Sequence, residues 1–247
     1  MTVTLGFDVE EFDFPLERGR GIDFGTQLAV SSEGLEFLLD LLARLELRAT
    51  FYTTANFALH RTDLVRRIVA GGHEVASHDY YHGLTAGSDP AGSRRTLEEL
   101  TGQRIVGYRA PSAALAAAGY RYNSSINPTW IPTRYNNLRA PCSVSREEGL
   151  TIYPVSVSAP FRVPLFWISL HVMPLPLYKL LCRSALRRDG HLNLYFHPWE
   201  FSARFRCSGL SYALFGDGPA TEIHPAAGVA ESPRLSVFDH PRIPRMR

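Results

Sequence analysis

The sequence predicts an α/β protein, a parallel barrel related to the TIM type with about six or seven strands. From residue 2 to residue 111, short apolar and β-branched runs alternate with segments of helical periodicity. Strands that alternate with helices pair in parallel and carry the helices outside the sheet. Polar residues of reactive types follow several of the apolar runs. In such a barrel the carboxyl ends of the strands meet on one face, where functional sites are built.

The first half of the chain alternates regularly. Strands are expected where β-branched and apolar residues gather, at residues 2–9, 49–57, 73–78 and 104–111. Helical spacing of leucines predicts the first helix, at residues 31–47, with Ser32 as its cap. Two more helices are expected at residues 61–72 and 91–102, and each ends in glycine.

The second half is less regular. Strands are predicted at residues 150–158 and 191–198. Residues 160–186 are apolar and aromatic with repeated prolines, which we interpret as a buried connection with a short helix. The alternative is an apolar rim for a lipid-linked substrate at a membrane surface. Residues 202–247 are rich in Gly, Pro, Ala and Ser and lack helical periodicity, so an irregular or partly disordered tail is expected.

Composition excludes several classes of protein. With 247 residues, 45% of them hydrophobic and 20% charged, the chain can bury a real core. A net charge of +2 is too small to suggest a nucleic-acid partner. The cysteines are far apart and lack CxxC spacing, which argues against a disulfide framework (Cys142, Cys182 and Cys207). No secretory signal or transmembrane run is recognisable, which favours the cytoplasm.

Two histidines and two carboxylates suggest a metal site. His78 and His82 are four residues apart, so both rings can face one point, although such a pair alone is more often structural. Neutral imidazole suits zinc and other divalent transition metals. Asp8 and Glu10 lie on the same face of a strand because side chains alternate with period two. One of these carboxylates could bind metal while the other acts as a base.

Two further groups follow predicted strands. Arg109 can orient a carboxylate through parallel hydrogen bonds, and His197 can act as a general acid because its pKa lies near neutrality. Taken singly, they could be a surface ion pair and a core histidine. Together with the metal-ligand candidates they indicate hydrolysis. A non-haem iron oxygenase also uses two histidines and a carboxylate, but its sites lie mostly in β folds.

The polar segments resemble the motifs of one known family, the polysaccharide deacetylases with a NodB homology domain (carbohydrate esterase family 4). The branch is the one whose first motif reads D-x-[DE]. The segments that carry the resemblance are "FDVEE", "GHEVASHDYYH", "YRAPS", "YNSSINP" and "LYFHPWEF". The resemblance runs from residue 2 to about residue 200 and implies a distorted (β/α)7 barrel. It therefore implies a catalytic domain at residues 1–201, followed by the tail at 202–247.

The resemblance also implies roles. Asp8 would be the general base, oriented by Arg109, and His197 the general acid. The metal ligands would be Glu10, His78 and His82. The divalent ion that they hold would be zinc, with Co²⁺, Ni²⁺, Mn²⁺ or Fe²⁺ as alternatives. The implied reaction removes an N-acetyl group from a sugar in a glycan or glycan precursor. The alternatives are a deformylase or other amide hydrolase, and a non-catalytic glycan-binding protein.

Predictions for the substrate side are less specific. Pro111, Asn123 and Trp199 are expected near the sugar, and Trp130 and Tyr135 are further aromatic candidates for stacking. Asn123 stands where the family has an aspartate that tunes the acid histidine, which predicts a weaker acid. A backbone N–H within residues 52–55 is a candidate oxyanion donor. The sequence leaves the oligomeric state open.

Overall fold

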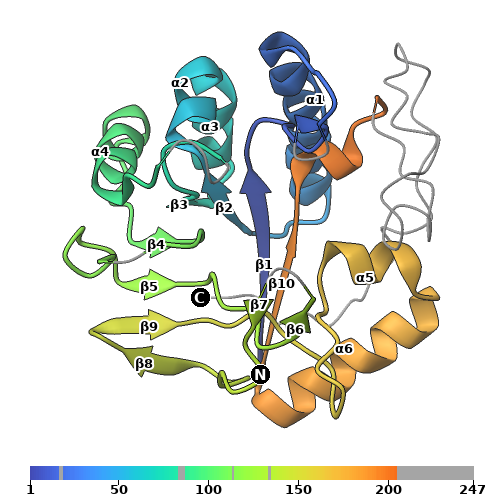
Figure 1. Ribbon diagram of the computed structural model, residues 1–247. Coiled ribbons are helices and arrows are strands. Elements are labelled where there is room, and N and C mark those ends of the chain that lie inside the picture. The colour runs from blue at the N-terminus through green and yellow to red at the C-terminus, as the bar shows by residue number, and fades with distance from the viewer. Residues whose placement is uncertain (17–18, 83–86, 113, 133–134, 205–247) are drawn as a thin grey trace.

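The computed structural model describes residues 1–16, 19–82, 87–112, 114–132 and 135–204. Its centre is an eight-stranded sheet in the order β10-β1-β2-β3-β4-β5-β9-β8. Pairing is parallel throughout, apart from the antiparallel pair of β8 with β9. In Figure 1 the last four strands of this order run across the direction of β1 and β10, so the sheet is strongly curled.

The elements of the described chain have the following bounds. The strands of the sheet are β1 (Thr2–Val9), β2 (Thr50–Thr53), β3 (Glu74–Ser77), β4 (Gly107–Tyr108), β5 (Tyr122–Asn123), β8 (Ser145–Glu147), β9 (Leu150–Ile152) and β10 (His191–Phe196). A separate antiparallel hairpin consists of β6 (Trp130–Ile131) and β7 (Tyr135–Asn136). The helices are α1 (Phe24–Arg44), α2 (Ala55–His60), α3 (Thr62–Ala70), α4 (Pro90–Thr101), α5 (Trp167–Val172), α6 (Leu175–Asp189) and the 3-10 helix η2 (Pro198–Phe201).

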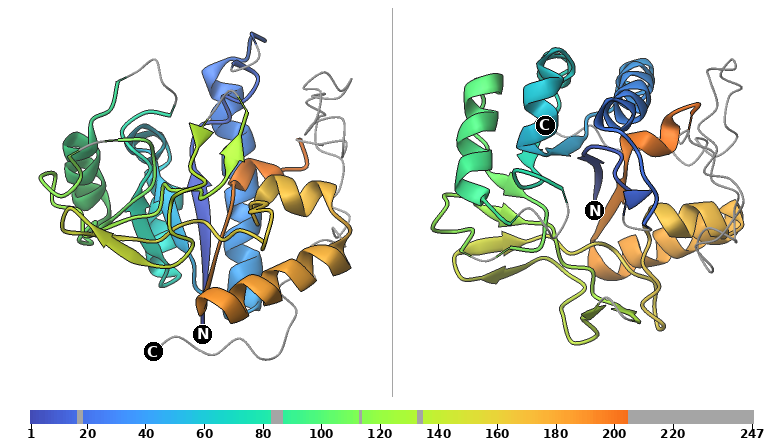
Figure 2. Two further views of the ribbon diagram at one scale, coloured as in Figure 1. Left: turned by 60° about the horizontal axis from the view of Figure 1, so that its bottom comes forward. Right: turned by 45° about the horizontal axis from the view of Figure 1, so that its top comes forward.

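The segment that follows β9 returns to the other edge of the curled sheet and contacts β10. The N–H of Ser156 donates to the carbonyl of Asn193 at 3.0 Å, and the Ser156 hydroxyl accepts from the N–H of Asn193 at 2.9 Å. An irregular stretch therefore stands beside the edge strand where a regular strand would stand in an ideal barrel. The predicted distorted barrel is confirmed, as a curled half-barrel of mainly parallel strands with helices on its outer side (Figure 2).

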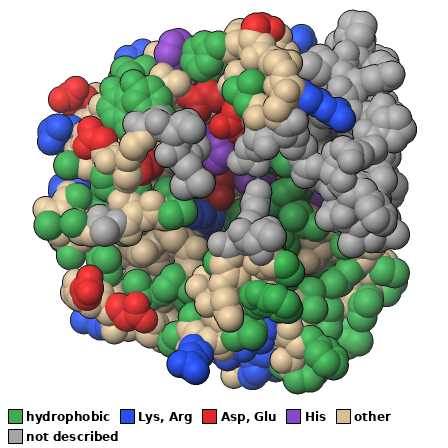
Figure 3. Space-filling view, viewed as in Figure 1, with side chains coloured by type: hydrophobic (Ala, Val, Ile, Leu, Met, Phe, Trp, Pro, Cys, Tyr) green, Lys and Arg blue, Asp and Glu red, His purple; other side chains and the backbone are tan. Residues whose placement is uncertain are grey.

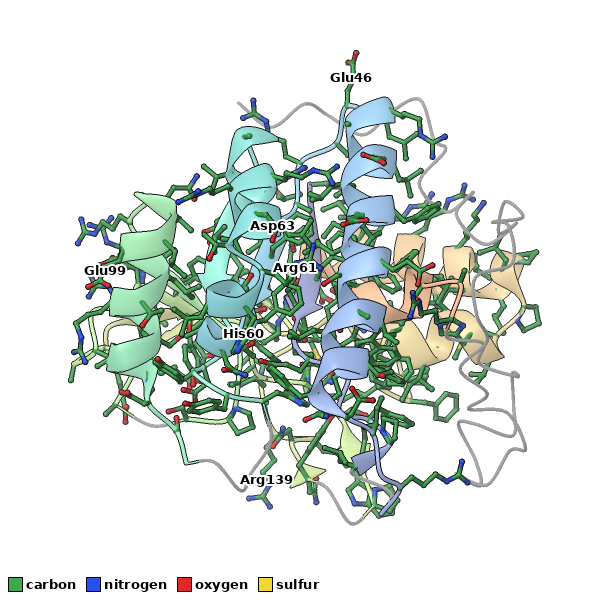
Figure 4. All side chains as sticks on the ribbon, turned by 90° about the horizontal axis from the view of Figure 1, so that it is seen from above. Glu46, His60, Arg61, Asp63, Glu99 and Arg139 are labelled. Atoms are coloured by element: carbon green, nitrogen blue, oxygen red, sulfur yellow. The ribbon has the colours of Figure 1, made fainter. Side chains whose placement is uncertain are left out.

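Helices α1 to α4 form a row on one side of the sheet (Figures 1 and 4). Arg61 joins two of them, because its guanidinium lies 2.9 Å from Asp63 in α3 and 3.5 Å from Glu36 in α1. Beneath the row lies an apolar core of aliphatic and aromatic residues, in which the rings of Phe7 and Phe51 stack at 5.2 Å between neighbouring strands. This apolar layer fixes the register of β1 and β2, whose carboxyl ends carry polar residues.

Helix α1 begins earlier than predicted. Its cap is Asp23, whose carboxylate accepts from the N–H of Thr26 at 2.9 Å, and not Ser32. Ser31 and Ser32 are instead buried within the helix. The prediction failed because the inner face of the first turns is lined by small polar residues, which carry no apolar periodicity.

The strand predicted at residues 49–57 is correct only in its first half. Thr54 ends β2, and its hydroxyl accepts from the N–H of Phe57 at 3.1 Å, which starts helix α2. The strands predicted at 104–111 and 150–158 are shorter in the structure, where they correspond to β4 and β9. Beyond β9 the chain still bonds to its neighbour, since the N–H of Tyr153 donates to the carbonyl of Asn123 at 2.8 Å, but the pattern is irregular.

Residues 160–186 form the predicted buried connection, with two helices in place of one short helix. Trp167, Tyr178 and Cys182 face the core, whereas Phe161 is 84% exposed and Leu180 is 61% exposed. Within the described ranges, no helix has the length and apolar character needed to cross a lipid bilayer. The tail predicted at 202–247 lies outside the described residues from 205 onward.

The fold leaves no room for a side chain at Gly34, where α1 crosses η2. A Cβ atom there would lie 1.8 Å from the carbonyl oxygen of Pro198. We expect Gly34→Ala to lower the free energy of unfolding by about 2 kcal/mol, as measured by urea denaturation, because one of the two elements must move. Glu36→Ala, on the outer side of the same helix, is the control and should cost less than about 0.5 kcal/mol. Equal stability of the two variants would contradict this contact.

Candidate active site

The polar residues singled out in the sequence converge at the carboxyl ends of the strands. Asp8 and Glu10 lie at the end of β1, His78 follows β3, Arg109 follows β4 and His197 follows β10. Parallel strands place these ends on one side of the sheet. In Figure 3 acidic and histidine side chains gather in a hollow on the face shown, with basic side chains beside them.

Glu10, His78 and His82 form a cluster that could hold a metal ion. Their ligand atoms all lie within 4.8 Å of one another. Glu10 Oε2 is 3.0 Å from His78 Nε2 and 3.1 Å from His82 Nε2. The Glu10 carboxylate is only 4% exposed, whereas a quarter of the His82 side chain is exposed. The cluster therefore has a buried anionic side and an open side at His82.

Each of the two histidines has its second ring nitrogen engaged. His78 Nδ1 is hydrogen-bonded to the carbonyl oxygen of Arg109, and His82 Nδ1 lies 2.8 Å from Asp13 Oδ2. A carbonyl or carboxylate oxygen only accepts, so both Nδ1 atoms carry the proton and both Nε2 lone pairs face Glu10. Sequence reasoning missed Asp13, although it lies in the same acidic segment as Glu10.

The cluster fits a divalent metal. Glu10 Oε2 is buried and makes no hydrogen bond, so it is an acceptor left without a donor. Burial alone would raise the pKa of Glu10, but the neighbouring imidazoles in their protonated form, His82 first, lower it to about 2, and a bound cation would favour the same anionic carboxylate when those imidazoles are neutral. An anionic oxygen with two neutral imidazole nitrogens is a donor set suited to zinc and its neighbours in the first transition series.

Asp8 has a different partner. Arg109 Nη1 donates to Asp8 Oδ1 at 2.8 Å, and both side chains are buried. The guanidinium is fixed by Ser124, whose carbonyl and hydroxyl accept from Nε and Nη2 at 3.1 and 2.9 Å. Burial is the largest single effect and disfavours the charged guanidinium, but Asp8, Tyr52 and Tyr195 together outweigh it and raise the pKa of Arg109. With Asp8 neutralised in this way, Glu10 is the carboxylate whose charge is left for a cation.

His197 lies on the far side of Glu10, with Nε2 4.0 Å from Glu10 Oε1. Its Nδ1 is 3.0 Å from Glu200 Oε1. Burial would lower the pKa of His197, but the carboxylates around it, led by Glu200, raise it. The imidazolium is therefore favoured, which is the form that a general acid needs. Sequence reasoning did not single out Glu200, three residues after the histidine.

The predicted substrate residues differ in exposure and in their partners. Pro111 is exposed just after β4. Asn123 is half-buried, and its side-chain oxygen accepts from the N–H of Ser125 at 2.9 Å. Trp199 is buried, and its indole N–H donates to Glu10 Oε1 at 3.3 Å while its ring stacks on His197 at 4.6 Å. Trp199 thus contacts the site residues from the buried side.

The proposed oxyanion donor is not found among the N–H groups of Thr54 and Ala55. They donate to the carbonyls of Val9 and Asp79 at 3.0 and 3.1 Å. Tyr52 and Thr53 belong to β2, which is paired on both sides. The sequence-based expectation for residues 52–55 was therefore wrong, because the start of α2 is tied to neighbouring loops by its own backbone.

Comparison with known proteins gives a consistent result. The sequence model of the family described as "Polysaccharide deacetylase" matches residues 22–125. This range includes His78, His82 and Arg109. Asp8, Glu10 and His197 lie outside it, and the folded chain brings them to the same site.

Two curated relatives are chitooligosaccharide deacetylases. The protein from Bradyrhizobium sp. (strain ANU 289) is 34% identical over 76 residues, which is 31% of this chain and 34% of the relative. The protein from Sinorhizobium fredii is 37% identical over 80 residues, 32% of this chain and 35% of the relative. The chain thus matches about a third of the length of these curated relatives.

The fold has relatives among solved structures. A crystal structure from Mycobacterium smegmatis that bears the polysaccharide deacetylase name superposes with a TM-score of 0.55 at 22% identity. The match covers 80% of this chain and 77% of that chain. The resemblance to the polysaccharide deacetylases is confirmed in sequence, and the barrel in structure.

The contact of Asp13 with His82 leads to a test on metal binding. We expect Asp13→Asn to weaken zinc affinity about 10- to 100-fold, because the charge that orients the imidazole and raises its basicity is removed. Zinc affinity is measured by competition with a chromogenic chelator. His78→Ala gives the reference for a lost ligand, and Asp40→Asn, on the outer side of α1, gives the control. If Asp13→Asn binds zinc as tightly as Asp40→Asn, Asp13 has no part in the site.

Proposed function

Starting from the relationship to the polysaccharide deacetylases, we propose that this chain is a metal-dependent hydrolase that removes the N-acetyl group from an N-acetylated sugar. The substrate class comes from the chitooligosaccharide deacetylases that match part of the chain. The observation that carries the proposal is that the cluster of Glu10, His78 and His82 lies at the same strand ends as an arginine-bound Asp8, with His197 4.0 Å from Glu10.

The ligand set would be Glu10, His78 and His82, with zinc as the first candidate. A divalent ion bound there would polarise the amide carbonyl and lower the pKa of a water molecule. The protein contributes the orientation of the two imidazoles through the Arg109 carbonyl and Asp13. Both contacts fix the ring planes before any ion arrives, which lowers the cost of binding.

Asp8 would act as the base. Arg109 holds one carboxylate oxygen of Asp8 by a hydrogen bond, which fixes the carboxylate at the end of β1. In the proposed reaction the oxygen of a water molecule adds to the amide carbon, and its proton passes to Asp8. A fixed base of this kind contributes about 10²- to 10⁴-fold to the rate.

His197 would act as the acid. When the C–N bond breaks, the leaving nitrogen takes the proton from His197 Nε2, and the products are acetate and a free amine. An amine anion is a very poor leaving group, so the proton is needed for the C–N bond to break. The buried carboxylates that face His197 keep its imidazolium form populated, which suits this step.

The sugar itself would lie over the open side of the cluster, near His82. Pro111 and Asn123 remain proposed contacts, and Trp130, which is 58% exposed on the separate hairpin, is an aromatic candidate for stacking on a sugar ring. Trp199 would support the substrate only indirectly, because its indole is buried against Glu10.

The test is acetate release from chitooligosaccharides by the zinc-loaded protein. We expect Asp8→Asn to lower kcat by about 10²- to 10⁴-fold while zinc content stays unchanged, because the proposed base is lost and the three proposed metal ligands are kept. Glu99→Gln, exposed on the outer side of α4 (Figure 4), is the charge-matched control and should keep full activity. The melting temperature is followed in parallel, since Asp8 also neutralises a buried arginine.

The same assay separates the alternatives. Release of formate, with no acetate, from an N-formylated analogue would favour a deformylase. Binding of the oligosaccharide without release of any acid would favour a glycan-binding protein. Failure of the wild type to bind zinc, Co²⁺, Ni²⁺, Mn²⁺ or Fe²⁺ would remove the metal-dependent mechanism.

A further inference from the structure

Glu200 connects two histidines that come from different parts of the fold. Its Oε1 lies 3.0 Å from His197 Nδ1, and its Oε2 lies 2.9 Å from His171 Nε2. His197 follows β10, whereas His171 belongs to helix α5. One carboxylate therefore has both of its oxygens occupied by imidazole nitrogens, which fixes its rotation as well as its position.

Burial makes this contact significant. The Glu200 side chain is 3% exposed and the His197 side chain 11% exposed, so water does little to screen them. A carboxylate oxygen only accepts hydrogen bonds, so His197 Nδ1 must carry the proton. That assignment leaves Nε2 as the nitrogen directed toward Glu10 and the reacting groups.

The ring of His197 is also held on its face. Trp199 stacks on it at 4.6 Å with an angle of 20° between the planes. Two residues of the "HPWE" segment thus hold its histidine in place: Trp199 contacts the face of the ring and Glu200 contacts Nδ1. Glu200 oxygen Oε1 also accepts from the backbone N–H of His197 at 2.5 Å, which closes the turn of η2.

Asn123 is occupied elsewhere. Among the described residues, the hydrogen bonds of its side chain go to Ser125, where both the backbone N–H and the hydroxyl contact the amide oxygen. The expectation that Asn123 makes His197 a weaker acid stays a prediction, but it left out Glu200, which supplies a charged partner from three residues further along the chain.

We propose that Glu200 is the positioning residue for His197 and that His171 holds Glu200 in that task. This inference rests on the proposed function, in which His197 gives a proton to the leaving nitrogen. Glu200 fixes the tautomer and the ring plane of His197, and His171 prevents the carboxylate from turning away. Neither residue touches the substrate.

A simple structural role predicts a different outcome. If Glu200 only capped η2, its loss would lower stability and affect every reaction at the site equally. If it positions an acid, its loss must affect only reactions that need a proton on the leaving group. An amide needs that proton, whereas 4-nitrophenyl acetate does not, because 4-nitrophenolate departs as the anion.

The experiment compares the two substrates in zinc-loaded Glu200→Gln and His171→Gln. For Glu200→Gln we expect kcat for chitooligosaccharide deacetylation to fall about 10- to 100-fold with KM unchanged, and hydrolysis of 4-nitrophenyl acetate to stay within about threefold of wild type. His171→Gln should show the same selectivity with a smaller loss. His78→Ala supplies the background rate of the ester assay.

The matched control is Glu33→Gln. Glu33 bonds to the hydroxyl of Ser202 at 2.7 Å, two residues beyond Glu200, but it approaches this segment from α1. It should lose some stability and keep both activities. An equal loss on both substrates in Glu200→Gln, or no loss on the amide, would overturn the proposal.

A second readout does not depend on activity. In protein with ¹⁵N-labelled histidine, the proton on His197 Nδ1 should give a downfield resonance, assigned by its loss in His197→Gln. It should move upfield in Glu200→Gln and persist unchanged in Glu33→Gln. An unmoved resonance would overturn the positioning role even if the wild type cleaves no sugar, so the two failures are distinguishable. Should Glu200→Gln not fold, His171→Gln carries the same test.

Discussion

The buried guanidinium of Arg109 is the interaction on which the site and the barrel both depend. It donates to Asp8 from β1 and to Ser124 after β5, and its Cζ lies 3.8 Å from the centroid of the Tyr52 ring in β2. Its own carbonyl accepts from His78 after β3. One residue thus contacts groups from four strands or their carboxyl ends, so the positions of Asp8, the proposed base, and of His78, a proposed metal ligand, are set together.

This arrangement constrains the residues around it. A charge buried this deeply must stay paired, because removal of one partner of a buried ion pair costs about 3–5 kcal/mol. The space is also limited, since a Cβ atom at Gly6 would lie 2.8 Å from Arg109 Nη1 and 3.1 Å from the ring of Tyr52. The glycine in β1 therefore admits the guanidinium between the strands. Asp8 has a structural task that precedes any catalytic one.

The sequence predicted the positions of residues that follow a regular strand or helix repeat. It did not predict hydrogen-bond partners that come from loops and single turns. Period two along β1 predicted that Asp8 and Glu10 share a face, and strand-end placement predicted which residues meet. Asp13 was missed because it reaches His82 from an irregular segment, and Glu200 because the single turn of η2 that brings it to His197 is too short to leave a repeat in the sequence. The start of α1 and the whole of α2 were missed for a related reason: side-chain caps at Asp23 and Thr54 decide them.

The three histidines of the site differ in what holds their second nitrogen. His78 bonds to a neutral carbonyl, His82 to the carboxylate of Asp13, and His197 to the carboxylate of Glu200. A charged acceptor makes the opposite nitrogen more basic than a neutral one does. The partner of His82 is partly exposed and that of His197 is buried, so the electrostatic effect is stronger on His197. Under the proposed function the same residue type would serve as a ligand at two positions and as a proton donor at the third, where its partner is a buried carboxylate.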